Sequence, residues 1–169
     1  MLNATKTIAA ISTASGAGGI GVIRVSGPLA LEIGQKISGG NLKPRIANFR
    51  SFKDLNGSLI DQGLILFFPG PNSFTGDDII EFQCHGGSVV TQSVLDLCLK
   101  LNAVLAEPGE FSKRAYLNNK IDLAQAESIV DLINATTLEA AQSAANSLSG
   151  KFSLEINNLL KYLIELRMY

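Results

Sequence analysis

The sequence predicts an α+β fold, with a mixed sheet and flanking helices followed by a truncated all-helical segment. Up to Pro108-Gly109, short β-branched runs alternate with stretches of helical periodicity, in an irregular order that a doubly wound parallel sheet does not have. Beyond that point the strand signals stop and helical periodicity remains. We therefore expect a sheet domain over residues 1–119 and the first helices of a helical domain over residues 120–169.

The first predicted elements are two strands and a helix. Residues 7–12 and 21–26 are β-branched runs on either side of a glycine-rich loop, residues 14–19. A helix is expected to begin at Pro28, because proline at the first helical position loses no needed hydrogen bond. It should end at Gly39-Gly40.

The middle of the chain predicts a hairpin and a further strand–helix–strand unit. Two runs, residues 49–52 and 59–68, flank Asn56-Gly57, a pair that tolerates the positive φ angles of a tight turn. An antiparallel pair of strands is therefore expected. A strand, a helix with regularly spaced apolar residues and a short return strand follow, over residues 78–84, 88–101 and 103–106.

The last part of the chain predicts helices with recognisable caps. Asp122 can cap a helix that begins at Leu123, with Gln125 reaching back as in a capping box. We expect a long helical segment from there to a break at Ser149-Gly150, since small alanines continue its apolar stripe. A final helix follows and has no stop signal before Tyr169, so we expect it to continue further.

Composition excludes several classes of protein. Hydrophobic residues make up 46% of the 169 and charged residues 17%, enough apolar surface to offset the chain entropy of folding. The apolar runs are far shorter than the ~20 residues that span a bilayer, so we expect a cytoplasmic protein without membrane contact. A net charge of -1 leaves no basic footprint for nucleic acid, so contact with RNA would be local or made by other parts of a larger protein.

Two nucleotide-binding patterns occur in unsuitable contexts. Residues 16–21 satisfy GxGxxG, but a dinucleotide site needs a helix at the last glycine, and residues 22–25 have the pattern of a strand. Residues 119–122 match the NKxD element that reads guanine in GTPases, yet the chain contains no GxxxxGK[ST] phosphate loop. We interpret the first as a loop between strands and the second as the lead into a capped helix. This chain alone is not expected to hydrolyse GTP.

The cysteines and the histidine do not form a reactive set. Cys84 and Cys98 have no CxxC spacing, which indicates free thiols rather than a disulfide framework. His85, the single histidine, lies beside Cys84, but neighbours on a strand point to opposite faces and no second histidine completes a zinc site. We interpret His85 as a turn residue before a helix start that could bind an anion, and expect no metal site and no catalytic residue.

Three charged residues lie at positions that the pattern of elements does not explain. Arg24 and Glu81 each interrupt an apolar strand, and Lys120 precedes the helix cap. Taken alone, they have two interpretations: solvated side chains on the outward faces of strands, or parts of a binding site. The residues themselves leave this choice open.

Four segments together resemble the MnmE (formerly TrmE) family of tRNA-modifying GTPases. They are ASGAGGIGVIRVSG from residue 14, PGPNSFTGDDIIEFQCHGG from residue 69, PGEFSKRAYLN from residue 108 and KIDLAQAE from residue 120. The resemblance implies an N-terminal domain similar to tetrahydrofolate-binding domains of one-carbon enzymes, then a helical domain into which the GTPase domain is inserted. This chain would stop before that insertion, so GTP, magnesium and potassium would belong to the absent GTPase domain.

The resemblance also implies an activity and partners. Full-length members act with the flavin-dependent partner MnmG (GidA) on the wobble uridine of tRNA, forming carboxymethylaminomethyluridine with a one-carbon unit from a tetrahydrofolate. They form a homodimer through the N-terminal domain, and tRNA is bound by the full complex.

Carried over by position, the family's contacts to 5-formyltetrahydrofolate or a related folate fall on Arg24, Glu81 and Lys120. A carboxylate such as Glu81 can accept two hydrogen bonds from the ring N–H and exocyclic amine of a pterin. Arg24 and Lys120 can pair with carbonyl or glutamyl carboxylate groups. Two alternatives remain: a dimerisation scaffold with a vestigial folate pocket, and a free-standing folate enzyme resembling the aminomethyltransferase of glycine cleavage.

Overall fold

A computed structural model describes residues 6–168, so the expected domain limits at residues 1 and 169 and the end of the last helix at Tyr169 lie outside it. The chain divides into two compact units, Met1–Arg114 and Ala115–Tyr169. The first unit contains the sheet and the second is helical.

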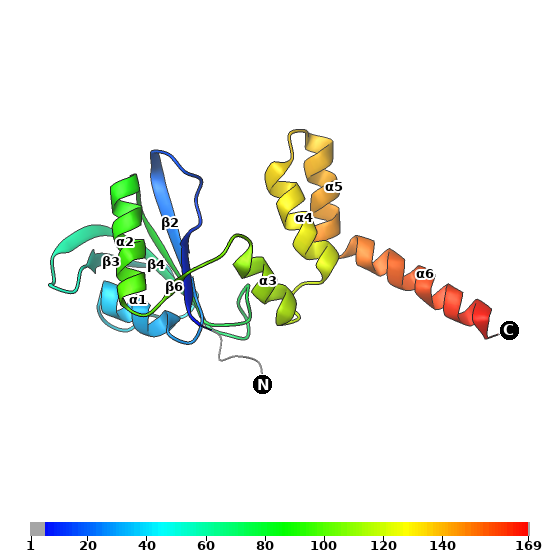
Figure 1. Ribbon diagram of the computed structural model, residues 1–169, viewed down its shortest axis with the longest axis horizontal. Coiled ribbons are helices and arrows are strands. Elements are labelled where there is room, and N and C mark those ends of the chain that lie inside the picture. The colour runs from blue at the N-terminus through cyan, green and yellow to red at the C-terminus, as the bar shows by residue number, and fades with distance from the viewer. Residues whose placement is uncertain (1–5, 169) are drawn as a thin grey trace. The chain divides into compact units, whose positions relative to one another are not determined.

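The first unit is built on a mixed sheet, which confirms the predicted α+β class (Figure 1). In the described part of the chain the sheet has six strands in the order β3-β4-β5-β2-β1-β6. Neighbouring strands are antiparallel except β1 and β6, which are parallel. The strands are β1 (Ile8–Ile11), β2 (Gly18–Ser26), β3 (Asn48–Lys53), β4 (Leu59–Phe68), β5 (Ile79–Gly86) and β6 (Val104–Leu105).

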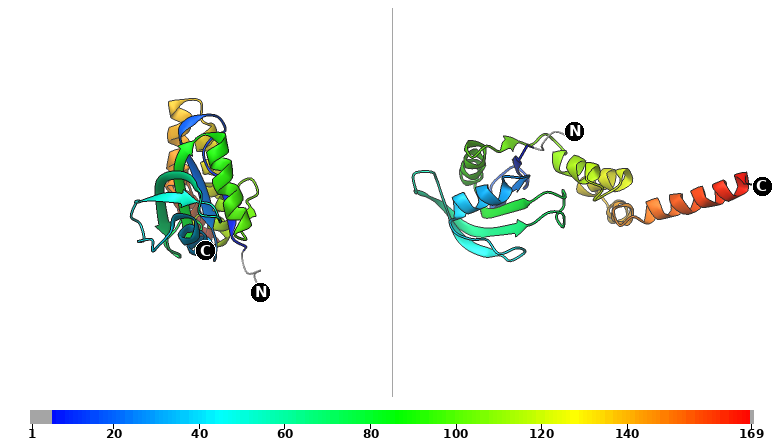
Figure 2. Two further views of the ribbon diagram at one scale, coloured as in Figure 1. Left: turned by 90° about the vertical axis from the view of Figure 1, so that its left-hand side faces the viewer. Right: turned by 90° about the horizontal axis from the view of Figure 1, so that it is seen from below.

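Two helices, α1 (Ala30–Ser38) and α2 (Ser88–Lys100), cover the same face of this sheet (Figure 2). Their buried residues and alternate strand residues form one hydrophobic core. The largest fully buried apolar side chains are Phe52, Phe82, Ile8, Ile23, Ile33, Ile37, Ile65, Ile80, Val25 and Val94. The intervening side chains of each strand therefore point to the opposite face of the sheet.

The strands around the glycine-rich loop differ from the prediction in length. β2 begins at Gly18 rather than at residue 21, because its first residues pair with the end of β5 through a register shift between Gly18 and Gly21. This pairing requires a glycine at the end of β5, since a Cβ on Gly86 would lie 2.6 Å from the carbonyl oxygen of Gly18. Long-range pairing of this kind leaves no local pattern in the sequence.

Helix α1 begins two residues after the predicted Pro28. The backbone N–H of Leu29 donates to the Thr7 hydroxyl at 2.9 Å, so the residue just before β1 satisfies a donor at the helix start. The helix ends at Gly39, as predicted. The start differs because its hydrogen-bond partner lies in a distant segment of the chain.

The β3–β4 hairpin is antiparallel, as predicted, but its turn is wider than an Asn-Gly pair alone would make. The Asp54 carboxylate accepts hydrogen bonds from the backbone N–H groups of Asn56 and Ser58, at 2.9 and 2.8 Å. Within residues 54–58, Gly57 alone has a positive φ, of 86°. A local side chain thus satisfies the turn amides, which is the usual role of aspartate in loops.

A short helix, α3 (Glu110–Leu117), was not predicted. Its first turn is held by the Glu110 carboxylate, which accepts from the backbone N–H of Glu107 at 2.8 Å and from Arg114 at 2.8 Å. Burial raises the pKa of Glu110, but these hydrogen bonds and the nearby Arg114 charge outweigh burial and lower it overall. The helix is short and stabilised by polar contacts, so apolar periodicity could not identify it.

The second unit continues with α4 (Leu123–Asn134), α5 (Leu138–Leu148) and α6 (Lys151–Arg167). The predicted capping box is confirmed: Asp122 accepts from the Gln125 N–H at 2.8 Å, and the Gln125 side chain accepts from the Asp122 N–H at 2.9 Å. The predicted continuous helical segment to Leu148 is wrong in one respect. It is interrupted between α4 and α5, where Thr137 caps α5 by accepting from the Ala140 N–H at 3.1 Å.

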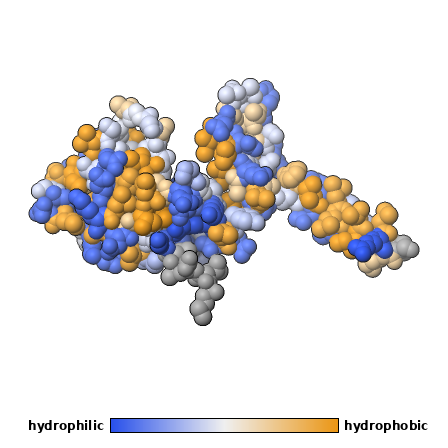
Figure 3. Space-filling view, viewed as in Figure 1, coloured by the Kyte–Doolittle hydropathy of each residue, from blue (hydrophilic) through white to orange (hydrophobic). Residues whose placement is uncertain are grey.

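The break at Ser149-Gly150 is confirmed, and Gly150 takes a φ of 83° at the start of α6. The Ser153 hydroxyl donates to Asp122 at 2.6 Å, so α6 contacts the cap of α4. Figure 3 shows apolar surface gathered over α6. The exposed apolar side chains on this helix and at its end are Phe152, Leu154, Ile156, Leu159, Leu160, Tyr162, Leu163, Ile164, Leu166 and Met168.

Candidate functional site

Arg24 and Glu81 lie directly opposite each other on the neighbouring strands β2 and β5. The guanidinium contacts one carboxylate oxygen, Glu81 Oε1, through Nε at 2.8 Å and Nη2 at 2.7 Å. The side chains are 29% and 17% exposed, so the pair is only partly in contact with water. Two of the three predicted site residues are therefore brought together, as an ion pair rather than as separate solvated side chains.

The alternation of β2 explains which face carries this pair. Ile23 and Val25 are fully buried in the core beneath α1 and α2. Arg24, between them, must point to the opposite face of the sheet, and its register partner Glu81 shares that face. The outward orientation expected from strand alternation is thus confirmed.

Two aromatic rings flank the Arg24 guanidinium. Its Cζ lies 5.7 Å from the ring centroid of Phe74 and 5.6 Å from that of Phe111. Both distances fall within the ~6 Å range of cation–π contacts. Phe74 lies in the β4–β5 connection and Phe111 on α3, so the site is assembled from three separate regions of the first unit.

The connection that carries Phe74 is tied to the sheet by hydrogen bonds. The buried hydroxyls of Ser26 and Thr75 are 2.7 Å apart, and the backbone N–H of Gly70 donates to the Asp78 carboxylate at 2.8 Å. A Cβ on Gly70 would lie 2.7 Å from the Gly76 carbonyl oxygen, so the two ends of this loop pack closely. Phe74 is held in place by its loop as well as by its own contacts.

Arg114 joins the aromatic-bearing loop to α3. This buried guanidinium bonds to Glu110 at 2.8 Å and lies 3.7 Å from the carboxylate of Asp77, in the loop. Because Asp77 follows Phe74 closely and Arg114 lies one turn after Phe111, this ion pair links the two segments that carry the rings. Sequence reasoning did not identify this residue, since a single arginine in a short helix gives no signal.

A small cavity adjoins Glu81. Its volume is about 210 Å³, below the ~300–1,000 Å³ typical of complete small-molecule pockets. One ring system could enter it, whereas an elongated ligand would extend outside. The cavity is lined by Arg45, Phe68, Asn72, Ser73, Phe74, Ile79 and Glu81.

Lys120, the third predicted site residue, belongs to the second unit. It lies between α3 and α4, and its backbone N–H donates to the Ala115 carbonyl at 2.8 Å. The NKxD pattern that contains it leads into the Asp122 cap, as predicted.

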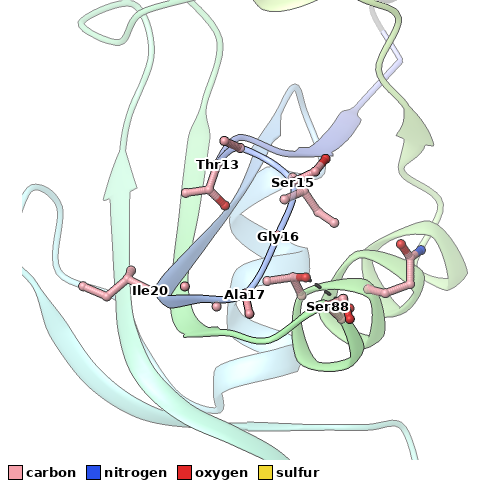
Figure 4. Close-up of a pocket in the computed structure, with 12 residues that line it drawn as sticks. Thr13, Ser15, Gly16, Ala17, Ile20 and Ser88 are labelled. Atoms are coloured by element: carbon pink, nitrogen blue, oxygen red, sulfur yellow. Dashed lines mark hydrogen bonds between the residues drawn. The ribbon is translucent and has the colours of Figure 1, made fainter.

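A larger cavity, of about 530 Å³, lies at the glycine-rich loop (Figure 4). The loop contributes Thr13, Ser15 and Gly16, and the start of α2 contributes Ser88. The last glycine of the GxGxxG pattern, Gly21, lies inside β2 rather than at a helix start, as predicted. The lining is uncharged, so this cavity offers no ionic anchor to a ligand.

His85 and Asp61 form a second polar pair, on the other edge of β5. The Asp61 carboxylate accepts from the His85 backbone N–H at 2.7 Å and contacts ring Nδ1 at 2.8 Å. Burial raises the pKa of Asp61, but the hydrogen bonds from His85 outweigh it and lower the pKa overall. The prediction of a turn at His85 is wrong, because β5 continues to Gly86.

The cysteines are both free, as predicted, and both are buried. Burial raises the pKa of Cys84 to about 11, with a further contribution from the Asp61 charge, and burial raises that of Cys98 to about 12. Cys84 is buried and its neighbour His85 is exposed, which confirms that they point to opposite faces. Over residues 6–168, no group of three or more His, Cys, Asp or Glu side chains is arranged to hold a metal.

Comparisons with known proteins agree with this division into a sheet and helices. Residues 7–120 match the family model described as GTP-binding protein TrmE N-terminus, and residues 123–169 match the MnmE helical domain. Within the described residues, no helix is long and apolar enough to cross a membrane. The two matches define the class, a TrmE-type N-terminal domain followed by a helical domain.

The chain belongs to the tRNA modification GTPase MnmE family. It is 55% identical to the tRNA modification GTPase MnmE of Pseudomonas entomophila (strain L48), over 97% of the chain and 36% of that protein. It is 56% identical to that of Pseudomonas paraeruginosa (strain DSM 24068 / PA7), over 100% of the chain and 37% of the relative. The relative from Saccharophagus degradans is also 56% identical, over 97% of the chain and 36% of its own length. The chain thus spans little more than a third of these relatives.

Proposed function

We propose that this chain is the N-terminal part of a cytoplasmic GTPase that modifies the wobble uridine of tRNA together with MnmG (GidA), forming carboxymethylaminomethyluridine. The names of its relatives support the GTPase and the tRNA modification. GTP, magnesium and potassium would bind to a GTPase domain outside this chain, which by itself does not hydrolyse GTP. We place the domain boundary at residues 119 and 120, next to the family-model boundary.

The contribution of this part is the binding of 5-formyltetrahydrofolate or a related one-carbon donor, and the formation of a homodimer. The observation that supports folate binding most is the partly buried Glu81 carboxylate, which lies beside a ring-sized cavity and near two phenylalanine rings. A pterin has paired N–H donors for such a carboxylate and a flat ring that can stack on aromatic side chains. Lys120 and Arg24 would pair with glutamyl carboxylate or carbonyl groups of the ligand.

Calorimetric titration with 5-formyltetrahydrofolate tests this assignment. Glu81→Gln keeps the size of the side chain but replaces one acceptor oxygen by an N–H donor, so a pterin donor would be left unsatisfied. Such a loss costs about 1–3 kcal/mol, which corresponds to tenfold or more in affinity. Glu32→Gln, at an exposed carboxylate on α1, is the matched control and should bind like the parent. Equal binding by Glu81→Gln and the parent would exclude Glu81 as the pterin contact.

The alternative is a dimerisation scaffold that does not bind folate. The ion pair itself favours it, because Glu81 already has a partner in Arg24 and needs no ligand to satisfy its charge. The same titration separates the two functions. A parent chain that dimerises but shows no heat of binding with 5-formyltetrahydrofolate would support the scaffold.

A further inference from the structure

We propose that Arg24 occupies the folate site in the ligand-free protein as an internal substitute for the pterin edge, and must leave Glu81 before a pterin can bind. This inference rests on the proposed folate function and concerns how the site is controlled. Arg24 would then be more than a ligand contact: it would compete with the pterin for Glu81 and so influence which ligand binds.

The Arg24 guanidinium and the hydrogen-bonding edge of a pterin are chemically alike. In Arg24, Nε donates to Glu81 Oε1 and Nη2 lies 2.7 Å from the same oxygen; these two nitrogens are attached to one planar carbon. In a pterin, the ring N–H and the exocyclic amine are likewise attached to one planar carbon. Both groups thus present two N–H donors in one plane, the arrangement that a carboxylate binds best. Glu81 could therefore accept from either group, from Arg24 at one oxygen or from a pterin at both.

The Glu81 carboxylate has a limited number of hydrogen-bond acceptor positions. A carboxylate has about four lone-pair sites, two on each oxygen. Glu81 Oε1 already accepts a hydrogen bond from Arg24 Nε at 2.8 Å, and Arg24 Nη2 lies 2.7 Å from the same oxygen, so the guanidinium occupies this oxygen. A pterin that needs both oxygens of Glu81 cannot bond to Oε1 until Arg24 withdraws. The two occupants therefore exclude each other.

Arg24 and a bound pterin ring would also compete for the same aromatic rings. Phe74 and Phe111 both lie within 6 Å of the Arg24 Cζ, and a stacked planar ring would use the same aromatic surface. The cavity next to Glu81 includes Phe74 in its lining, so a ring bonded to the carboxylate would contact this phenylalanine too. Displaced Arg24 is still charged and 29% exposed, and it can then pair with the anionic tail of the ligand.

This mechanism gives Arg24 two opposite effects that depend on the ligand. A pterin without a glutamyl tail competes with Arg24 for Glu81 and has no carboxylate that could pair with the released guanidinium. A complete folate also competes, but it regains an ion pair with the released guanidinium. Removing Arg24 should therefore favour the tail-less ligand over the complete folate, whereas a simple ligand contact would never improve binding when removed.

The test is calorimetric titration of the parent, Arg24→Met and Arg24→Lys with 6-hydroxymethylpterin and with 5-formyltetrahydrofolate. Methionine keeps length and apolar contact with the rings but has no donor. We expect Arg24→Met to bind 6-hydroxymethylpterin up to about fivefold more tightly, the factor that corresponds to releasing one partly exposed ion pair. Affinity for 5-formyltetrahydrofolate should rise less or fall. Arg24→Lys retains the charge without the planar donor pair and should lie between parent and Arg24→Met.

Circular dichroism of each variant establishes folding, and Arg24→Lys keeps the test decisive if Arg24→Met does not fold. If both variants bind 6-hydroxymethylpterin more weakly than the parent, Arg24 does not compete with the pterin for Glu81. If the parent's binding still depends on Glu81, the proposed folate function stands. Absence of binding of either ligand to the parent and to every variant would instead overturn the folate function, and the present inference with it.

Discussion

At the scale of single residues, two polar pairs join neighbouring strands of the sheet. Arg24 and Glu81 connect β2 to β5, and Asp61 and His85 connect β4 to β5. Arg24 and Glu81 attract attention in the sequence because each places a charge inside an apolar strand, but only the family resemblance predicted that they belong to a binding site. Asp61 could not, since its role depends on a histidine 24 positions away on another strand.

We predict that the contribution of Asp61 to stability is lost in acid. Its pKa is lowered in the folded protein, so its stabilising effect is fully present above the unfolded aspartate pKa of about 3.9 and disappears as pH falls through the lower folded value. Asp61→Asn should lower the free energy of unfolding by about 1–2 kcal/mol at pH 7, since hydrogen bonds to charged groups exceed neutral ones. Urea unfolding at pH 7 and at pH 3 measures this.

The control for this measurement is Glu32→Gln, at an exposed carboxylate. It should change stability little at either pH. The expected difference between parent and Asp61→Asn narrows at pH 3, because this pH lies below the unfolded aspartate pKa of about 3.9. A difference that stays constant or widens between pH 7 and pH 3 would contradict the role of the ionised carboxylate.

At the scale of elements, local hydrogen bonds cap the starts of α4 and α5. The capping box of α4 could be predicted because all its atoms belong to residues 122–125. The interruption before α5 was missed because the apolar and alanine-rich stripe suggests continuity, while the Thr137 cap competes locally with it. The contact from Ser153 to Asp122 joins α6 to the same cap and has no sequence signature.

We predict that Asp122→Ala destabilises the helical unit more than Thr137→Ala does. Each change removes an N-cap acceptor, which costs about 0.5–2 kcal/mol. Asp122→Ala also removes the acceptor of the Ser153 hydroxyl, a contact that together with the Gln125 N–H lowers the pKa of Asp122. Thermal unfolding followed by far-ultraviolet circular dichroism provides the comparison. Equal midpoints for the two variants would show that the Ser153 contact adds nothing.

At the scale of the whole molecule, the open face of the sheet differs from the face covered by helices. It carries the Arg24–Glu81 pair and half-buried apolar residues, and Ile20 and Phe49 on this face are 67% and 64% exposed. The exposed apolar surface is consistent with the homodimer that the family resemblance implies. Burial of such side chains is favourable by roughly 25 cal/mol per Å².

We predict that the chain is a homodimer at micromolar concentration. Sedimentation velocity over a range of concentrations should give a mass near twice the 17.9 kDa of one chain. Because folate would bind within the folded sheet unit, added 5-formyltetrahydrofolate should not dissociate the dimer. A monomer throughout this range, with and without the ligand, would contradict both the dimer and the scaffold alternative.

The sequence by itself determined the α+β class, the approximate positions of the strands and longer helices, and two residues of the candidate site. The class and the elements rest on local periodicity, turn residues and caps, whose physical causes lie within a few positions of each other, whereas the two site residues rest on the family resemblance. The tertiary structure decided the strand order, the short helix α3, the pairing of Arg24 with Glu81, and the placement of Phe74 and Phe111 around them. Those features depend on contacts between residues far apart in the chain, and such contacts exist only once the sheet has formed.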